Sequence, residues 1–144
     1  YIENYLSIKK IIFGERLQYE INCDEKIKSF KIPFFSLQPF VENSMEHGIL
    51  NKEDGGTVKI ICSKLPHSVL LVISDNGIGI EQTQLKYIEE NILTNLKKPP
   101  EKHVGMFNCY NRYKVAFDEK ADIKIESAVQ KGTKITVEIL TDVI

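Results

Sequence analysis

Tryptophan is absent from this sequence, cysteine is scarce, and charge of neither sign predominates. The three cysteines (Cys23, Cys62 and Cys109) are odd in number and widely spaced, which argues against a disulfide framework or zinc site and favours buried thiols in a reducing compartment. A net charge of −1 excludes the strongly basic surface of a general nucleic-acid binder. The apolar runs fall far short of the roughly 20 residues that span a bilayer. We therefore expect a domain that contacts neither nucleic acid nor membrane directly.

What is present suffices for one folded domain. A chain of 144 residues, 42% of them hydrophobic, can bury a proper core. The sequence begins at Tyr1 rather than at a methionine and enters an amphipathic pattern at once. We therefore expect a domain excised from a longer protein.

Hydrophobic periodicity predicts alternating helices and strands. Apolar residues recur at helical spacing in 2–13, 36–47, 81–91 and 105–117, and they alternate with polar residues in 16–23, 57–64, 69–75, 123–127 and 133–140. Gly14 is placed to end the first helix, and Ser36 is the expected N-cap of the second. Residues 92–104 lack a clean period and contain two prolines, which is typical of a loop. This order predicts a two-layer α/β fold.

The segment Asp75-Asn76-Gly77-Ile78-Gly79 directly follows the strand predicted over 69–75. A carboxylate at a strand end can accept a hydrogen bond from the exocyclic amine of adenine, whereas guanine presents an oxygen there and is repelled. The glycines allow positive φ and let a flat base approach the main chain. With the helix at 36–47 upstream, the segment predicts an ATP site. Thr133, at the start of the last strand, is either a further contact to the base or an ordinary β-favoured residue.

The helix predicted over 36–47 groups polar side chains opposite its apolar face. Asn43, Glu46 and His47 share that polar face, and Glu42 lies at its edge. Mg²⁺ prefers oxygen ligands and is usually completed by waters and substrate phosphates, so one side-chain carbonyl suffices as the protein ligand. Asn43 is therefore the candidate metal ligand, and an ordinary solvated helix face is the alternative.

A candidate phosphate site lies at Gly105, where a helix should begin. Free backbone N–H groups and the positive end of the helix dipole attract phosphate at such a position. The cations before it form either a lid over a triphosphate or a solvated charged loop; they are Lys97, Lys98, Lys102 and His103.

Four motifs in this order resemble the ATP-binding domain of YesM/LytS-type sensor histidine kinases. They are Leu37-Gln38-Pro39-Phe40-Val41-Glu42-Asn43, Asp75-Asn76-Gly77-Ile78-Gly79, Gly105-Met106-Phe107-Asn108 with Arg112, and Lys131-Gly132-Thr133. The resemblance covers nearly the whole chain. It implies a Bergerat-type two-layer α/β sandwich, with a mixed, mostly antiparallel sheet and helices on one face. It also implies a linker helix at 1–15 from a phosphoacceptor region, a catalytic domain at 16–144 and an ATP lid at about 92–104.

The same resemblance implies roles for individual residues. Asn43 would hold Mg²⁺, and Glu42 beside it would orient the attacking imidazole or a water. The expected nucleotide contacts are Asn43, His47, Asp75, Gly77, Gly79, His103, Gly105, Met106 and Thr133. His103 departs from the Gly-x-Gly pattern frequent at this place in the family, so we expect its side chain to contact phosphate.

The implied activity is that of a protein histidine kinase, which passes the γ-phosphate of ATP to a histidine and then to a response regulator. The implied setting is a membrane-tethered homodimer, with this domain on the cytoplasmic side. The family's acceptor motif of the Asn-Pro-His-Phe type is absent here, so we expect ATP binding without self-phosphorylation. The alternatives are a non-catalytic nucleotide-sensing or partner-docking domain, and another ATPase of the same fold, of the chaperone, topoisomerase or mismatch-repair type.

Overall fold

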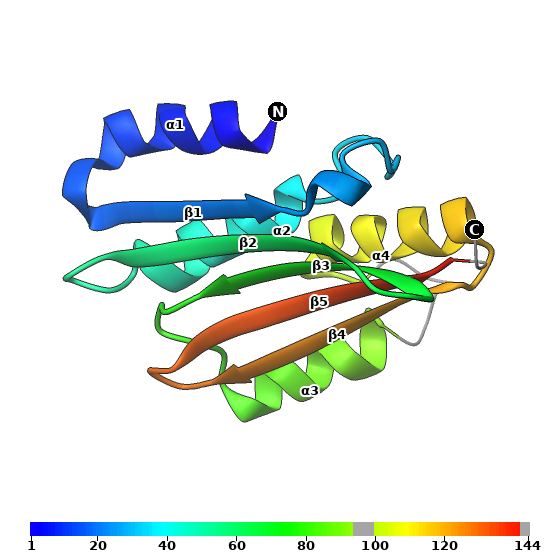
Figure 1. Cartoon of the computed structure of the whole chain (residues 1–144). Coiled ribbons are helices and arrows are strands. Elements are labelled where there is room, and N and C mark those ends of the chain that lie inside the picture. The colour runs from blue at the N-terminus through cyan, green and yellow to red at the C-terminus, as the bar shows by residue number, and fades with distance from the viewer. Residues whose placement is uncertain (94–99, 142–144) are drawn as a thin grey trace.

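The computed structural model describes residues 1–93 and 100–141. A five-stranded sheet in the order β1-β2-β3-β5-β4 forms one layer (Figure 1). The strands are β1 (Leu17–Cys23), β2 (Gly56–Lys64), β3 (Ser68–Asp75), β4 (Ala121–Ala128) and β5 (Gly132–Leu140). β1 pairs with β2 in parallel, and the other three pairs are antiparallel. The predicted two-layer α/β fold with a mixed, mostly antiparallel sheet is confirmed.

Helices cover one face of the sheet and lie along one of its edges (Figure 1). They are α1 (Ile2–Phe13), α2 (Gln38–Asn43), the π-helix η3 (Ser44–Ile49), α3 (Gln82–Asn91) and α4 (Val104–Phe117), with one-turn 3-10 helices η1 (Gly14–Arg16) and η2 (Glu25–Ile27). In Figure 1, α2, α3 and α4 lie behind the sheet, and α1 runs along the β1 edge. Gly14 ends α1 with a φ of 58°, as predicted. Of the predicted loop at 92–104, residues 94–99 lie outside the described residues, and Val104 already belongs to α4. No helix in the described ranges is long and apolar enough to cross a bilayer.

The core lies between the sheet and its covering helices. Alternate residues of β3 (Val69, Leu71 and Ile73) are buried there, and Phe40 of α2 packs from the helical side. Burying each such side chain stabilises the fold by about 1.5–3 kcal/mol. Asp75 is the next residue in the same alternation, so the period of two turns its carboxylate toward the helices at the end of β3.

Ser36 does not cap the second helix, so that prediction is wrong. The N-cap is Leu37, and no side chain caps this end. Ser36 is buried and its Oγ donates to the Tyr113 hydroxyl of α4 at 2.9 Å. The Ser36 hydroxyl therefore makes a tertiary hydrogen bond instead of capping the helix.

Replacing Ser36 with alanine is expected to lower the free energy of unfolding by about 1–2 kcal/mol, because it leaves the buried Tyr113 hydroxyl without its donor. Chemical denaturation measures the change, with Ser29→Ala at an exposed position as the control. In the double variant with Tyr113→Phe the two losses should not add. Fully additive losses would show that this hydrogen bond contributes nothing.

Candidate functional site

A hollow lies between the adjoining ends of β3 and β5 and the helices η3, α3 and α4. It brings together seven of the residues predicted from the sequence, namely Asn43, His47, Asp75, Gly79, His103, Met106 and Thr133. Three predicted residues do not line it: Glu42, Gly77 and Gly105. The predicted residues that line the hollow therefore come from four separate parts of the chain, as a ligand site requires.

Asp75 is the buried acid of this hollow, with 9% of its surface exposed. Its Oδ1 accepts a hydrogen bond from the Gly77 N–H at 2.9 Å. Its Oδ2 is buried and has no hydrogen-bond partner among the residues that the structure describes. Burial raises the pKa of the carboxyl, and the Gly77 N–H, the Ser44 hydroxyl and the Thr133 backbone oppose that rise. An acceptor left unmatched in this way fits a ligand that donates, such as an aromatic amine.

Gly77 allows the chain after β3 to pack closely against η3. A Cβ on Gly77 would lie 2.3 Å from the Gly48 carbonyl carbon, and a Cβ on Gly48 would lie 2.8 Å from Asp75 Oδ1. Ile78 N–H also donates to the Gly48 oxygen at 3.1 Å. The chain after β3 is thus packed directly on η3, and the two glycines fix the position of the Asp75 carboxylate.

Gly79 has a φ of 72°, and a Cβ there would lie 2.0 Å from the Ala128 oxygen. A side chain is excluded both by the backbone conformation and by the neighbouring hairpin. This position therefore requires glycine, and its positive φ is the one expected from the sequence.

The π-helix η3 was not predicted. It continues α2 without a break, so the Asn43 and His47 side chains both reach the hollow, while Glu46 is exposed and does not line it. The Asn51 side chain donates to the Glu46 and His47 oxygens at 2.9 and 3.3 Å and holds the last turn. Single turns of π-helix occur frequently at functional sites. The helix predicted over 36–47 ended directly before Gly48, so the periodic pattern did not indicate this turn.

His103 stands at the N-cap of α4 with a left-handed backbone, at a φ of 61°. Its Nε2 lies 3.3 Å from Gln84 Nε2 of α3. Burial lowers the pKa of the imidazole, and the charges of His47 and Lys102 lower it further. This shift favours the neutral imidazole, which is a hydrogen-bonding group, over the cation.

The N-terminal turn of α4 follows at once. The helix's hydrogen bonds begin with Phe107 N–H to the His103 oxygen at 3.1 Å, so the N–H groups of Val104, Gly105 and Met106 precede the first intrahelical bond. Gly105 contributes backbone here rather than lining the hollow. Of the three lysines predicted to precede this helix, Lys102 lies among the described residues, and Lys97 and Lys98 lie outside them.

His103→Gly is expected to raise the free energy of unfolding by about 0.5–1 kcal/mol, because glycine adopts a left-handed backbone without the penalty of a Cβ. Urea denaturation of the variant and the wild type tests this. The control is His67→Gly, at a position without positive φ, which should gain nothing. Equal effects at the two positions would mean that His103 carries no strain.

Ser127 of β4 is a residue that the sequence did not single out. Its Oγ donates to the Gly132 oxygen and accepts from the Ile80 N–H, both at 2.9 Å, and it lies 2.9 Å from Thr133 Oγ1. Because the single hydroxyl proton of Ser127 is directed to Gly132, the Thr133 hydroxyl must donate to Ser127. The lone pairs of the Thr133 oxygen then remain available to a ligand in the hollow.

Two predicted polar residues have structural partners outside the hollow. Glu42 Oε1 accepts from the Gln38 side chain at 2.7 Å and lies beside Tyr5 of α1. Burial and then the Glu42 charge raise the pKa of Tyr5 to about 12. Arg112 donates to the Phe34 oxygen at 2.8 Å and so holds the segment before α2. Neither contact bears on whether Glu42 or Arg112 contacts a ligand.

The family described as "Histidine kinase-, DNA gyrase B-, and HSP90-like ATPase" matches residues 34–142, which include every residue of the hollow. The chain belongs to this ATPase family. Its members bind ATP, generally with Mg²⁺. The Asp75 carboxylate oxygen, buried and unmatched among the described residues, is what an adenine amine requires, so the site of this chain fits the family's nucleotide.

The relatives of this chain are consistent with membership of this ATPase family. The sensor protein kinase HptS of Staphylococcus aureus is 26% identical over 139 residues, which cover 96% of this chain and 26% of the relative. The chain thus spans about a quarter of the length of that relative. The YesM/LytS subtype remains a prediction.

Solved structures share the fold at low sequence identity. The blue-light activated histidine kinase of Erythrobacter litoralis superposes with a TM-score of 0.64 at 14% identity, covering 96% of this chain and 40% of that one. The mycobacterial sensor histidine kinase MprB gives 0.60 at 15% identity, covering 99% and 93%. The catalytic domain of the histidine kinase ThkA gives 0.59 at 15% identity, covering 96% and 91%.

Proposed function

We propose that this chain is the ATP-binding catalytic domain of a two-component sensor histidine kinase. It donates the γ-phosphate of ATP to a histidine outside these residues, for relay to a response regulator. The observation that carries the proposal is the buried Asp75 oxygen without a partner among the described residues, in a hollow that Asn43 and the start of α4 also line. Membership of the ATPase family and the similarity to HptS support it.

In this proposal the residues in and around the hollow have separate roles in binding the nucleotide. Asp75 Oδ2 accepts the adenine amine, with Thr133 beside it and Gly77 and Gly79 keeping the main chain close. His47, His103 and Met106 contact the nucleotide from η3 and α4, and the backbone N–H groups at Gly105 face its phosphates. Asn43 supplies one oxygen ligand to Mg²⁺, which neutralises phosphate charge when it is bound. The chain's own contribution is to position the phosphate and exclude water.

Asn43→Ala is expected to remove the Mg²⁺-dependent part of ATP affinity, a loss of about 10-fold or more, because the side-chain oxygen is the proposed protein ligand. Calorimetric titration with a non-hydrolysable ATP analogue, with Mg²⁺ and with EDTA, measures that part. Asn22→Ala, at an exposed position on β1, is the control. An Asn43→Ala variant that still gains affinity from Mg²⁺ would exclude Asn43 as the ligand.

Phosphoryl transfer is tested by mixing this chain with the separate acceptor-bearing region of its full-length protein and ATP labelled on the γ-phosphate. Label should appear on an acceptor histidine only when both parts are present. Glu42→Gln should slow this transfer if Glu42 orients the attacking imidazole or a water; unchanged transfer would remove that role. Nucleotide binding without any transfer would favour the non-catalytic nucleotide-sensing or partner-docking domain instead.

The proposed setting is a homodimeric, membrane-tethered sensor kinase with this domain on the cytoplasmic side. It follows the resemblance to sensor histidine kinases and the name of HptS, a sensor protein kinase about four times as long as the matched region. Fractionation and crosslinking of the full-length protein test this setting. A soluble monomer would contradict it.

A further inference from the structure

The end of the β1–β2 ladder brings two cysteines side by side. The parallel register pairs Cys23 of β1 with Cys62 of β2, and Asp24 N–H donates to the Cys62 oxygen at 2.9 Å, which fixes the pairing there. Adjacent strands lie about 4.8 Å apart. Disulfides span Cα separations of about 4.4–6.8 Å. Residues paired across neighbouring strands point to the same face of a sheet, so the backbone already presents both thiols within bridging distance.

The two thiols differ in access. Cys23 is exposed, because the burial of β1 decreases from Leu17 toward its end at the sheet edge, and the prediction of a buried thiol is wrong there. Cys62 is half-buried against the core. Burial raises the pKa of Cys62 to about 11, with the charge of Cys23 and a hydrogen bond to it as further causes. Cys23 is therefore the thiol that a reagent in solution can reach, and Cys62 is its neighbour across the ladder.

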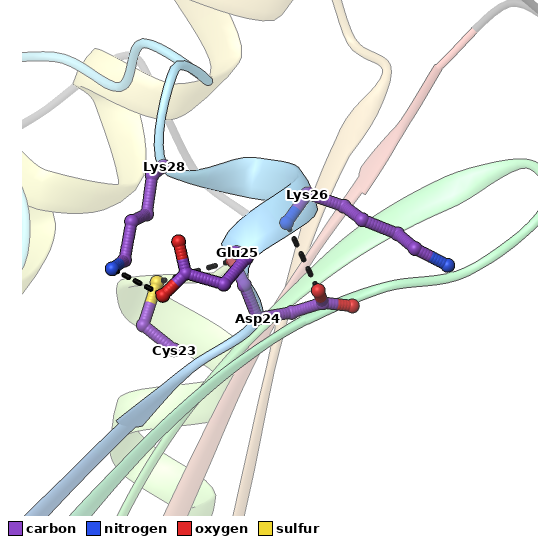
Figure 2. Close-up of polar contacts among 5 residues, drawn as sticks. All are labelled: Cys23, Asp24, Glu25, Lys26 and Lys28. Carbon is purple, nitrogen blue, oxygen red and sulfur yellow. Dashed lines mark hydrogen bonds and ion pairs between the residues drawn. The ribbon is translucent and has the colours of Figure 1, made fainter.

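The turn after Cys23 is fixed by its own contacts and leaves the sulfur at the surface. The Asp24 side chain accepts from Lys26 N–H at 3.0 Å, and Glu25 pairs with Lys28 across η2. Cys23 Sγ lies 3.8 Å from the Asp24 oxygen. Figure 2 shows the Cys23 side chain pointing to the same side of the segment as the Glu25–Lys28 pair.

We propose that Cys23 and Cys62 are a dithiol modification site that hydrogen peroxide converts to an intramolecular disulfide. The Cys23 sulfur attacks one peroxide oxygen, the O–O bond breaks, and a sulfenic acid and one water form. The Cys62 sulfur then attacks the Cys23 sulfur, and the hydroxyl leaves with the Cys62 proton as a second water. Two thiols are thereby oxidised by two electrons, and the peroxide is reduced to two waters.

The bridge closes a loop from Cys23 to Cys62 that contains α2 and η3, and hence Asn43 and His47. Such a closure restricts the unfolded chain, so the oxidised domain should melt at a temperature higher by roughly 5–15 °C. Cys109 is buried in α4 and pairs with neither thiol in the sheet register. It should remain a free thiol.

The test treats the reduced 144-residue chain with hydrogen peroxide, alkylates the remaining thiols and maps the peptides by mass spectrometry without reduction. The expected product is a Cys23–Cys62 linked peptide within one chain, with Cys109 alkylated, and dithiothreitol should reverse both the link and the rise in melting temperature. Cys109→Ser should give the same link. Cys62→Ser should stop at oxygen adducts of Cys23.

Three results would overturn the proposal. One is a wild type that yields the same Cys23 oxygen adducts as Cys62→Ser. Another is a link between two chains rather than within one. The third is an absence of oxidation under peroxide, when iodoacetamide shows that Cys23 is reactive in the folded chain.

Discussion

Asp75→Asn should weaken adenine-nucleotide binding by about 100-fold or more and should not weaken the fold. Asp75 lines the hollow, its Oδ2 has no partner among the described residues, and a charged acceptor makes the stronger hydrogen bond to an amine. A 100-fold loss corresponds to about 2.8 kcal/mol, within reach of one lost charge-assisted hydrogen bond together with an amide donor turned toward the ligand's donor. Calorimetric titration with an ATP analogue measures the loss.

The stability of the same variant has a defined pH dependence. Burial raises the pKa of Asp75 in the folded chain, so the stability that its protonated form contributes is present below the unfolded pKa of about 3.9 and is lost as pH rises through the folded pKa. Asparagine does not titrate. The free energy of unfolding of Asp75→Asn, relative to wild type, should therefore rise as the pH increases from about 4 through the folded pKa of Asp75.

Asp54→Asn, at an exposed position near the same end of the sheet, is the matched control and should change neither binding nor the pH dependence. If Asp75→Asn bound ATP as tightly as wild type, the Asp75 carboxylate would not be the adenine contact. If it unfolded more easily at pH 7, the carboxylate would be a structural group that the fold requires.

Gly77→Ala should destabilise the domain by about 2–4 kcal/mol and abolish nucleotide binding. Its Cβ would lie 2.3 Å from the Gly48 backbone, which cannot yield without moving η3 or Asp75. Chemical denaturation and nucleotide titration of the same samples measure the two effects.

The matched control is another glycine of the predicted nucleotide motifs. A Cβ on Gly105 would meet Pro39 at 3.4 Å, which is ordinary contact, so Gly105→Ala should keep its stability within about 1 kcal/mol or gain slightly in the helix. Its backbone N–H is retained, and so nucleotide affinity should stay within a few-fold of wild type. Equal damage from both substitutions would mean that close packing at Gly77 is not the cause.

Period-two alternation and helical spacing predicted the helices and strands within a few residues, because each element buries one face on a single core. The parallel pairing of β1 with β2 was beyond such patterns, since it depends on how α2 and η3 return the chain to the sheet. Ser36 shows the same limit. Its position before the helix predicted a cap. In the structure its hydroxyl instead bonds to Tyr113, 77 residues away in the chain.

The candidate site was predictable where chemistry and backbone requirements coincide. Asp75 and Gly79 stand in a short motif whose residue types follow from the geometry of a strand end. Gly48 and Ser127 were missed because their roles arise only on folding, when one abuts the Asp75 carboxylate and the other orients the Thr133 hydroxyl. Part of the predicted lid lies in 94–99, outside the described residues, and stays a prediction.

Nucleotide selectivity of the wild-type chain tests the central claim most directly. Calorimetric titration with Mg²⁺ and non-hydrolysable analogues of ATP and GTP should show binding of the adenine nucleotide and at least about 100-fold weaker binding of the guanine nucleotide, because guanine directs an oxygen at the Asp75 carboxylate. Equal affinity for both, or no binding by the folded chain, would contradict an adenine site built on Asp75.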